Sequence, residues 1–115
     1  MMRIAQRESK KGYGKYRLGA CIVDKKGKVI GRGYNRPVTH PTFGNEYSGN
    51  LHAEASALIQ ALKSGKSLSG GSCFVYRVGG NIAKPCPCCE EFLRSHGIST
   101  VYFSCNGGET HQMEL

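Results

Sequence analysis

The chain has 115 residues, six cysteines and a formal net charge of +8. This length provides one domain, residues 1–115, with a single hydrophobic core of moderate size, and it excludes two such cores. No segment approaches the roughly 20 apolar residues that span a membrane, and the first seven residues contain no apolar run able to act as a signal peptide. We therefore expect a cytoplasmic protein with reduced thiols and no membrane partner.

Positive charge is concentrated at the N-terminal end. Residues 1–36 contain eleven Lys or Arg and only two acidic residues, a net charge of +9, whereas residues 37–115 have a net charge of −1. A solvated surface accounts for any single lysine here. As a block, however, these residues create a field that attracts phosphate, so we expect a phosphorylated ligand.

The N-terminal third predicts a helix and a β-hairpin. Residues 2–11 form the short helix, which Gly12 and Gly14 end. Two apolar strands follow at residues 18–23 and 28–34, with a turn between them.

Residues 37–49 form an irregular segment with two prolines and two glycines, long for a connection in so small a domain. Loops of this kind often shape a substrate pocket. Ordinary packing on a surface loop explains its side chains equally well. The three candidates for contact with a base are His40, Phe43 and Tyr47.

The next segment predicts a helix. Asn50 is a good N-cap, and apolar residues then recur at helical spacing, which places His52 and Glu54 in the first turn. The apolar stripe, expected to be buried, consists of Leu51, Ala55, Leu58, Ile59 and Leu62.

The C-terminal half predicts a strand, a helix and two more strands. Residues 72–78 form the first strand, and Pro87 and Gly97 mark the start and the end of the second helix. Residues 98–104 should pair in parallel with the preceding strand, because a helix connects the two.

The Asn106-Gly107 pair predicts a tight turn into an antiparallel final strand. The expected fold is therefore α/β, with a mixed five-stranded sheet flanked by helices and the last strand antiparallel.

Two separated segments together offer a metal site. His52 supplies an imidazole nitrogen, and Cys86 and Cys89 supply two thiolates at C-x-x-C spacing. Zinc accepts these ligands, and three protein ligands leave a position for water, which is typical of a catalytic site. Zinc lowers the pKa of such water to about 7, and Glu54 is placed to take up and deliver the proton. Cys88 is expected to be a spare thiol.

Both helix starts should point at this metal. Residues i and i+2 lie roughly 200° apart around a helix, so His52 and Glu54 can converge only on a metal just beyond the helix end. Each helix start contributes about half a positive charge, which favours the thiolate forms of Cys86 and Cys89.

The triplet His52-Ala53-Glu54, together with the segment from Pro85 to Cys89, resembles the paired signature of the zinc-dependent cytidine and deoxycytidylate deaminase superfamily. Gly33-Tyr34-Asn35 is similar to the Gly-x-Asn segment of deoxycytidylate and tRNA adenosine deaminases. The order of elements agrees from about residue 18 to residue 103.

The resemblance implies a three-layer, cytidine deaminase-like fold. It also implies zinc bound by His52, Cys86 and Cys89, and proton transfer by Glu54. The backbone of Ala53 would contact the base, and Asn35 would hold the sugar.

Two features point to different branches of that superfamily. Free-nucleoside cytidine deaminases usually have Cys at the position of His52, so the ligand set resembles the nucleotide, tRNA, riboflavin-pathway and nucleic-acid-editing branches. An antiparallel last strand instead resembles the nucleoside deaminases and some toxin-type DNA deaminases. The substrate therefore stays open.

We expect a zinc-dependent hydrolase of pyrimidine nucleotide metabolism, a homo-oligomer that converts cytosine to uracil in a cytidine or deoxycytidine nucleotide or nucleoside. One alternative is a cytosine deaminase acting on single-stranded DNA or RNA. A remoter one is a structural zinc module that binds nucleic acid, with a fourth ligand from His40, His96, His111 or Cys88. Glu54 favours the enzyme, since a structural site has no use for this carboxylate. A riboflavin-pathway deaminase usually carries a reductase domain, which this chain lacks.

Overall fold

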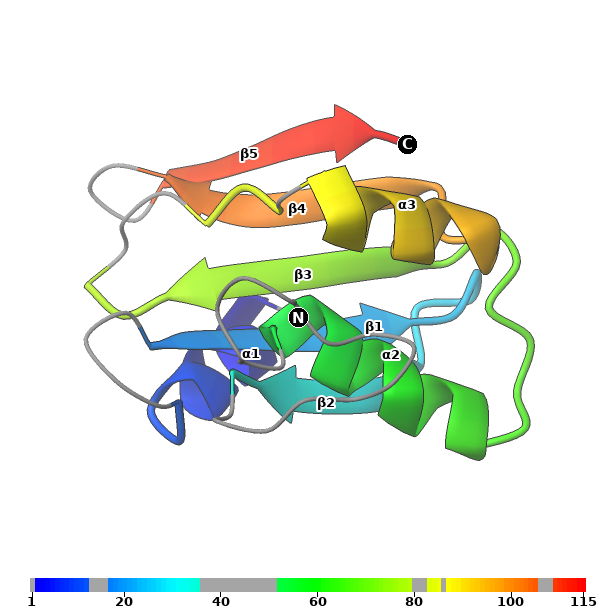
Figure 1. Cartoon of the computed structure of the whole chain (residues 1–115), viewed down its shortest axis with the longest axis horizontal. Coiled ribbons are helices and arrows are strands. Elements are labelled where there is room, and N and C mark those ends of the chain that lie inside the picture. The colour runs from blue at the N-terminus through cyan, green and yellow to red at the C-terminus, as the bar shows by residue number, and fades with distance from the viewer. Residues whose placement is uncertain (1, 13–16, 36–51, 80–82, 86, 106–108) are drawn as a thin grey trace.

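A computed structural model describes residues 2–12, 17–35, 52–79, 83–85, 87–105 and 109–115. The three helices and five strands follow the order expected from the sequence (Figure 1). Their bounds are α1 Met2–Ser9, β1 Leu18–Val23, β2 Val29–Tyr34, α2 Ala53–Lys63, β3 Ser72–Arg77, α3 Pro87–Ser95, β4 Thr100–Cys105 and β5 Glu109–Glu114.

The strands form one mixed sheet in the order β2-β1-β3-β4-β5. The pair β3–β4 is parallel, and the pairs β1–β2, β1–β3 and β4–β5 are antiparallel. The predicted parallel unit around α3 and the predicted antiparallel last strand are both confirmed. The turn predicted at Asn106-Gly107 lies outside the described residues.

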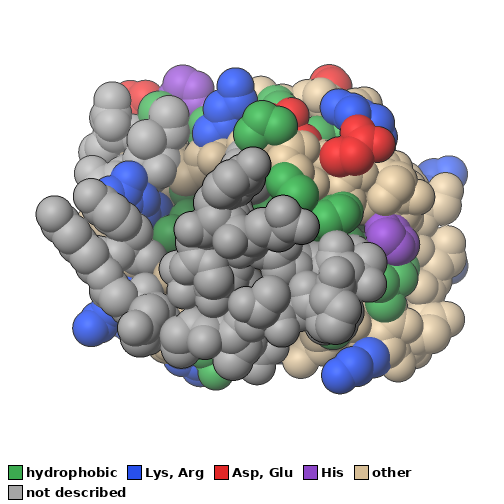
Figure 2. All heavy atoms as spheres, viewed as in Figure 1, with side chains coloured by type: hydrophobic (Ala, Val, Ile, Leu, Met, Phe, Trp, Pro, Cys, Tyr) green, Lys and Arg blue, Asp and Glu red, His purple; other side chains and the backbone are tan. Residues whose placement is uncertain are grey.

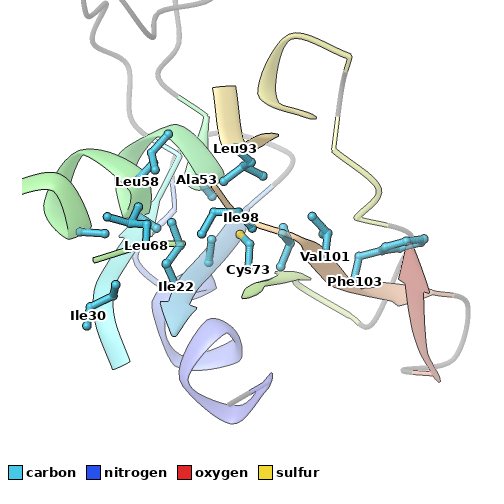
Figure 3. Packing of buried hydrophobic residues seen from close by; sticks show 14 of the residues in the cluster. Ile22, Ile30, Ala53, Leu58, Leu68, Cys73, Leu93, Ile98, Val101 and Phe103 are labelled. Atoms are coloured by element: carbon cyan, nitrogen blue, oxygen red, sulfur yellow. The ribbon is translucent and has the colours of Figure 1, made fainter. Parts of the chain in front are cut away.

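Helices cover both faces of the sheet, which gives three layers. Figure 1 shows α1 behind the sheet, where it packs on β1 and β3, and α2 and α3 in front of it. The main core fills the space in front, where Leu58 of α2, Leu93 of α3 and Ile22 of β1 belong to one buried hydrophobic cluster (Figure 3). Each of these side chains is at most 1% exposed, and burying one contributes about 1.5–3 kcal/mol to stability.

Glycines on β2 let α2 approach the sheet closely. A Cβ at Gly31 would lie 2.3 Å from the carbonyl oxygen of Ala57, and one at Gly33 would lie 2.4 Å from the backbone nitrogen of Ala57. Ala57 and Ala61 are fully buried against these glycines. Small residues on both elements thus set the spacing between α2 and β2.

This packing corrects the predicted apolar stripe of α2. Ala55 and Leu58 are buried as expected, but Leu62 is 38% exposed and Ile59 is only half-buried. The buried face is instead shifted toward Ala57 and Ala61, because the glycine surface of β2 accepts alanine and has no space for a leucine. Leu51 lies outside the described residues.

Charge is distributed unevenly over the face seen in Figure 2. Acidic side chains visible on this face lie toward α3 and β5, with Lys and Arg among them, whereas the side formed by α2 and β2 shows Lys and Arg without visible acidic side chains. None of the described helices is long and apolar enough to cross a membrane.

Candidate metal and catalytic site

His52 lies immediately before α2. It occupies the N-cap position with extended backbone angles (φ −68°, ψ 154°), and its side chain makes no capping hydrogen bond. The helix therefore begins later than predicted, because Asn50 was expected to be the N-cap; Asn50 itself lies outside the described residues. A non-capping imidazole at a helix start can point away from the helix, toward a ligand of its own.

Cys89 comes from the first turn of α3 and meets His52. The Sγ atom of Cys89 lies 3.3 Å from Nδ1 of His52, although 37 residues separate the two in the sequence. Cys89 is only 3% exposed, whereas its neighbour Cys88 is exposed. The expected convergence of the two helix starts is thus found for this pair of side chains.

The pair fits a tetrahedral zinc ion. Zn–S and Zn–N bonds of about 2.3 and 2.0 Å at a tetrahedral angle put the two donor atoms about 3.5 Å apart, close to the observed separation. Among the described residues, no three His, Cys, Asp or Glu side chains form a group that could hold a metal. Cys86, the third expected ligand, lies outside that part of the chain, directly beside the buried Pro85.

Glu54 lies in the first turn of α2 and is only 4% exposed. Ala53, just before it, is 1% exposed. A buried carboxylate is costly unless it has partners, and Glu54 has such interactions within the structure. Its burial beside the His52–Cys89 pair is consistent with the proton-carrying role expected from the sequence.

Beneath this region lies the buried thiol of Cys73 on β3. Desolvation raises the pKa of Cys73 well above its ordinary value, and the nearby Glu54 carboxylate and the Cys21 thiol raise it further. Cys73 therefore stays protonated. A neutral thiol under Glu54 adds no second negative charge to this part of the core. No sequence pattern indicated this neighbour, since the relation between Cys73 and Glu54 depends on how α2 lies across the sheet.

Asn35 lies just after β2, and its side chain is anchored in the fold. The Oδ1 atom of Asn35 accepts a hydrogen bond from the backbone N–H of Leu18 at 2.9 Å. The backbone N–H of Asn35 donates to the Leu18 carbonyl at 3.2 Å. Together these two hydrogen bonds extend the β1–β2 pairing by one residue. A contact with a sugar stays a prediction, and it would use the other end of the amide.

Two of the histidines proposed as a fourth ligand, His96 and His111, make other contacts. His96 follows the last turn of α3, where its Nδ1 donates to the Phe92 carbonyl at 2.8 Å. His111 is on β5, with its ring 6.0 Å from that of Phe103. His40, Phe43 and Tyr47 lie outside the described residues.

The three-layer α/β fold brings a His and a Cys from two helix starts together, as the His/Cys/Cys metal site of a zinc-dependent deaminase requires. The family model described as "Cytidine and deoxycytidylate deaminase zinc-binding region" matches residues 1–105, so the chain belongs to this family. The match covers every described element except β5.

Solved structures of deaminases resemble this fold. The cytidine deaminase of Burkholderia pseudomallei superposes with a TM-score of 0.77 at 23% identity, covering 98% of this chain and 88% of that one. At this identity the likeness shows the fold alone. The dCMP deaminase of cyanophage S-TIM5 has a TM-score of 0.69 at 28% identity, with 93% of this chain and 82% of that chain covered. No curated protein sequence matches the chain.

A bifunctional enzyme shares only part of its length with this chain. The diaminohydroxyphosphoribosylaminopyrimidine deaminase/reductase of Thermotoga maritima has a TM-score of 0.60 at 28% identity. The alignment covers 89% of this chain but only 27% of that chain.

Proposed function

We propose that the protein is a single-domain, zinc-dependent hydrolase that converts cytosine to uracil in a cytidine or deoxycytidine nucleotide. The observation that carries this proposal is the contact of His52 with Cys89 beside the buried Glu54. Membership of the cytidine and deoxycytidylate deaminase family supports it.

His52, Cys86 and Cys89 would hold the zinc ion, whose contribution is to lower the pKa of a water molecule in the site. In the overall reaction, water adds at C4 of the cytosine ring and ammonia leaves. Glu54 would carry the proton, first to N3 and then to the departing amine. The backbone of Ala53 would hold the base, and Asn35 would hold the sugar.

We infer a phosphorylated substrate because the described N-terminal elements contain many Lys and Arg residues, whose positive field attracts phosphate. The dCMP deaminase of cyanophage S-TIM5, similar to this chain at 28% identity, has been solved in complex with dCMP and dUMP. This supports a nucleotide over an uncharged nucleoside. Single-stranded DNA or RNA is the second candidate, favoured by the same positive field.

The proposal includes assembly into a homo-oligomer in the cytoplasm. Both outer strands of the sheet, β2 and β5, have one side without a partner strand among the described elements, and such edges favour association. Light scattering at micromolar concentration would contradict this part of the proposal if it gave the mass of a monomer.

The decisive experiment measures uracil formation from cytidine, dCMP, dCTP and a cytosine-containing single strand, at low and moderate salt. We expect dCMP or dCTP to be converted fastest. Conversion of the single strand alone would favour the second candidate, and preference for cytidine would show that the basic region does not serve the substrate.

A variant tests the proton carrier. Glu54→Ala should keep zinc but lose a factor of roughly 10² to 10⁴ in turnover, because it removes the group that transfers the proton. Full activity in this variant would refute the assignment of Glu54.

A further inference from the structure

A cavity of about 390 Å³ opens along the outer edge of the sheet. Its walls come from the end of α1, from β2 and from the outward side of α2. Of the proposed catalytic and metal-binding residues that the structure describes, neither His52, Glu54 nor Cys89 lines it. The volume lies within the range of about 300–1,000 Å³ that is usual for small-molecule sites.

The charged side chains of this cavity are mostly basic. Among the described residues, Lys11, Arg32 and Lys63 line it, together with the acidic Glu8. Glu8 is 7% exposed and is already neutralised, because its carboxylate lies 2.8 Å from Nζ of Lys11. Neither Arg32 nor Lys63 forms an ion pair with any described residue. Their two charges are therefore free to act on a ligand.

A neutral side chain adds a hydrogen-bond donor to the same wall. Oε1 of Gln60 accepts the backbone N–H of Arg32 at 2.6 Å, and this bond fixes which end of the amide faces the strand. The Nε2 group of Gln60 is then the end left to donate. The cavity thus combines two unpaired cations with a fixed donor, and this combination selects anions.

We propose that this cavity, which we call the β2-edge groove, binds the phosphate groups of a ligand. Arg32 supplies a planar fork of donors suited to phosphate oxygens, and Lys63 supplies a second charge from the last turn of α2. Concave walls concentrate the positive field, so an anion is held more strongly there than on a flat surface with equal charge. The phosphate belongs to a small polyphosphate or to the backbone of a single strand.

The test uses the zinc-loaded full chain and two probes that contain no cytosine. Pyrophosphate represents the small ligand and is titrated by calorimetry. A thymidine-only single strand represents the polynucleotide and is followed by fluorescence anisotropy at several salt concentrations. Neither probe can be deaminated at a cytosine ring, so failure of this proposal and failure of the proposed function are distinguishable.

The test variant is Arg32→Gln with Lys63→Gln, and the matched control is Lys26→Gln with Lys66→Gln. The control removes the same charge from two exposed positions outside the β2-edge groove. We expect the test variant to weaken binding of the preferred probe by about a hundredfold, or about tenfold for each lost charge-assisted contact. The control should change binding by about twofold, because solvent and salt screen distant charges.

The salt dependence identifies the source of the phosphate. If the single strand is the ligand, its logarithmic salt slope should fall by about 0.7 for each phosphate contact removed. Binding of pyrophosphate without the strand would assign the groove to a small ligand. Equal weakening in the test variant and the control would overturn the proposal, as would failure of the wild type to bind either probe. Lys63→Gln alone, at an exposed helix end, keeps the test valid if the Arg32 change affects folding.

Discussion

Sγ of Cys89 and Nδ1 of His52 lie 3.3 Å apart, one at the start of α3 and the other just before α2. This distance is close to one edge of the ligand tetrahedron around zinc. The contact brings together two segments that lie 37 residues apart in the sequence. The candidate metal site therefore depends on the packing of α2 beside α3.

Adjacent cysteines allow a matched test of the metal site. Cys89→Ser should lose most bound zinc, because it replaces a buried thiolate that touches His52. Cys88→Ser should keep about one zinc per chain, because Cys88 is exposed to solvent whereas Cys89 is buried. Zinc is measured by atomic emission after gel filtration. Loss of zinc in Cys88→Ser alone would reverse the assignment.

Substitutions at Asn35 can separate its structural role from its proposed contact with the sugar. Asn35→Ala removes the acceptor for the Leu18 N–H and should cost about 1 kcal/mol of stability. Asn35→Asp keeps an acceptor oxygen in place but removes the amide N–H donors. We therefore expect Asn35→Asp to retain the melting temperature and to discriminate less between dCMP and free cytosine. Unchanged discrimination would leave Asn35 with the strand-pairing role alone.

The close packing of α2 on β2 predicts a strong effect of adding one methyl group. Gly33→Ala would place a Cβ 2.4 Å from the backbone nitrogen of Ala57, so α2 must move. We expect a loss of about 1–3 kcal/mol in unfolding free energy, together with weaker zinc binding, since α2 begins next to His52.

Gly27 provides the control for Gly33. Its Cβ would meet nothing within 4 Å, and asparagine tolerates its positive φ of 87°. Gly27→Asn should therefore keep the zinc content of the wild type, measured by atomic emission. In urea unfolding it should lose less stability than Gly33→Ala, because only the strain of its positive φ remains. Equal losses in the two variants would show that the packing against Ala57 is not the cause.

The buried thiol of Cys21 predicts a fall in stability at high pH. Burial raises the pKa of Cys21 from 9.0 to about 11, partly offset by the positive charges of the N-terminus and Arg32. The folded state thus keeps this proton when the unfolded state has lost it. The stabilisation is complete below pH 9 and is lost as the pH rises toward 11, at up to roughly 1.4 kcal/mol per pH unit.

The measurement is urea unfolding under reducing conditions across this pH range. Cys21→Ala should lower the stability at neutral pH but flatten its decline above pH 9, because no thiol remains to titrate at this position. An unchanged slope in Cys21→Ala would assign the decline to other groups.

Local patterns predicted the elements well because each has a strong signal of its own. Strand β1 runs over the predicted residues 18–23, and α3 begins at Pro87 and is followed by Gly97 with a φ of 92°. The parallel pairing of β3 with β4 followed from the helix between them. These features need no knowledge of distant contacts.

The sequence predicted less well which side chains of a helix are buried and which distant residues contact one another. The burial of Ala57 and Ala61 in place of Leu62 depends on glycines more than 20 residues earlier in the chain. The β2-edge groove likewise combines residues from α1, β2 and α2, and no spacing rule connects them. In the candidate site, the ligand types were readable from the C-x-x-C and His-Ala-Glu patterns, but the fit of His52 to Cys89 required the tertiary structure.

The parallel β3–β4 pair has a consequence for the order in which the protein can assemble. His52 follows a local hairpin, whereas Cys89 lies on the connection between two strands that pair only after α3 has crossed the sheet. Pairings with a large sequence separation form slowly, because loop-closure entropy is lost before contacts compensate for it. The two proposed zinc ligands His52 and Cys89 therefore come together only when the C-terminal half has joined the sheet, so uptake of zinc by a nascent chain would report that folding is complete.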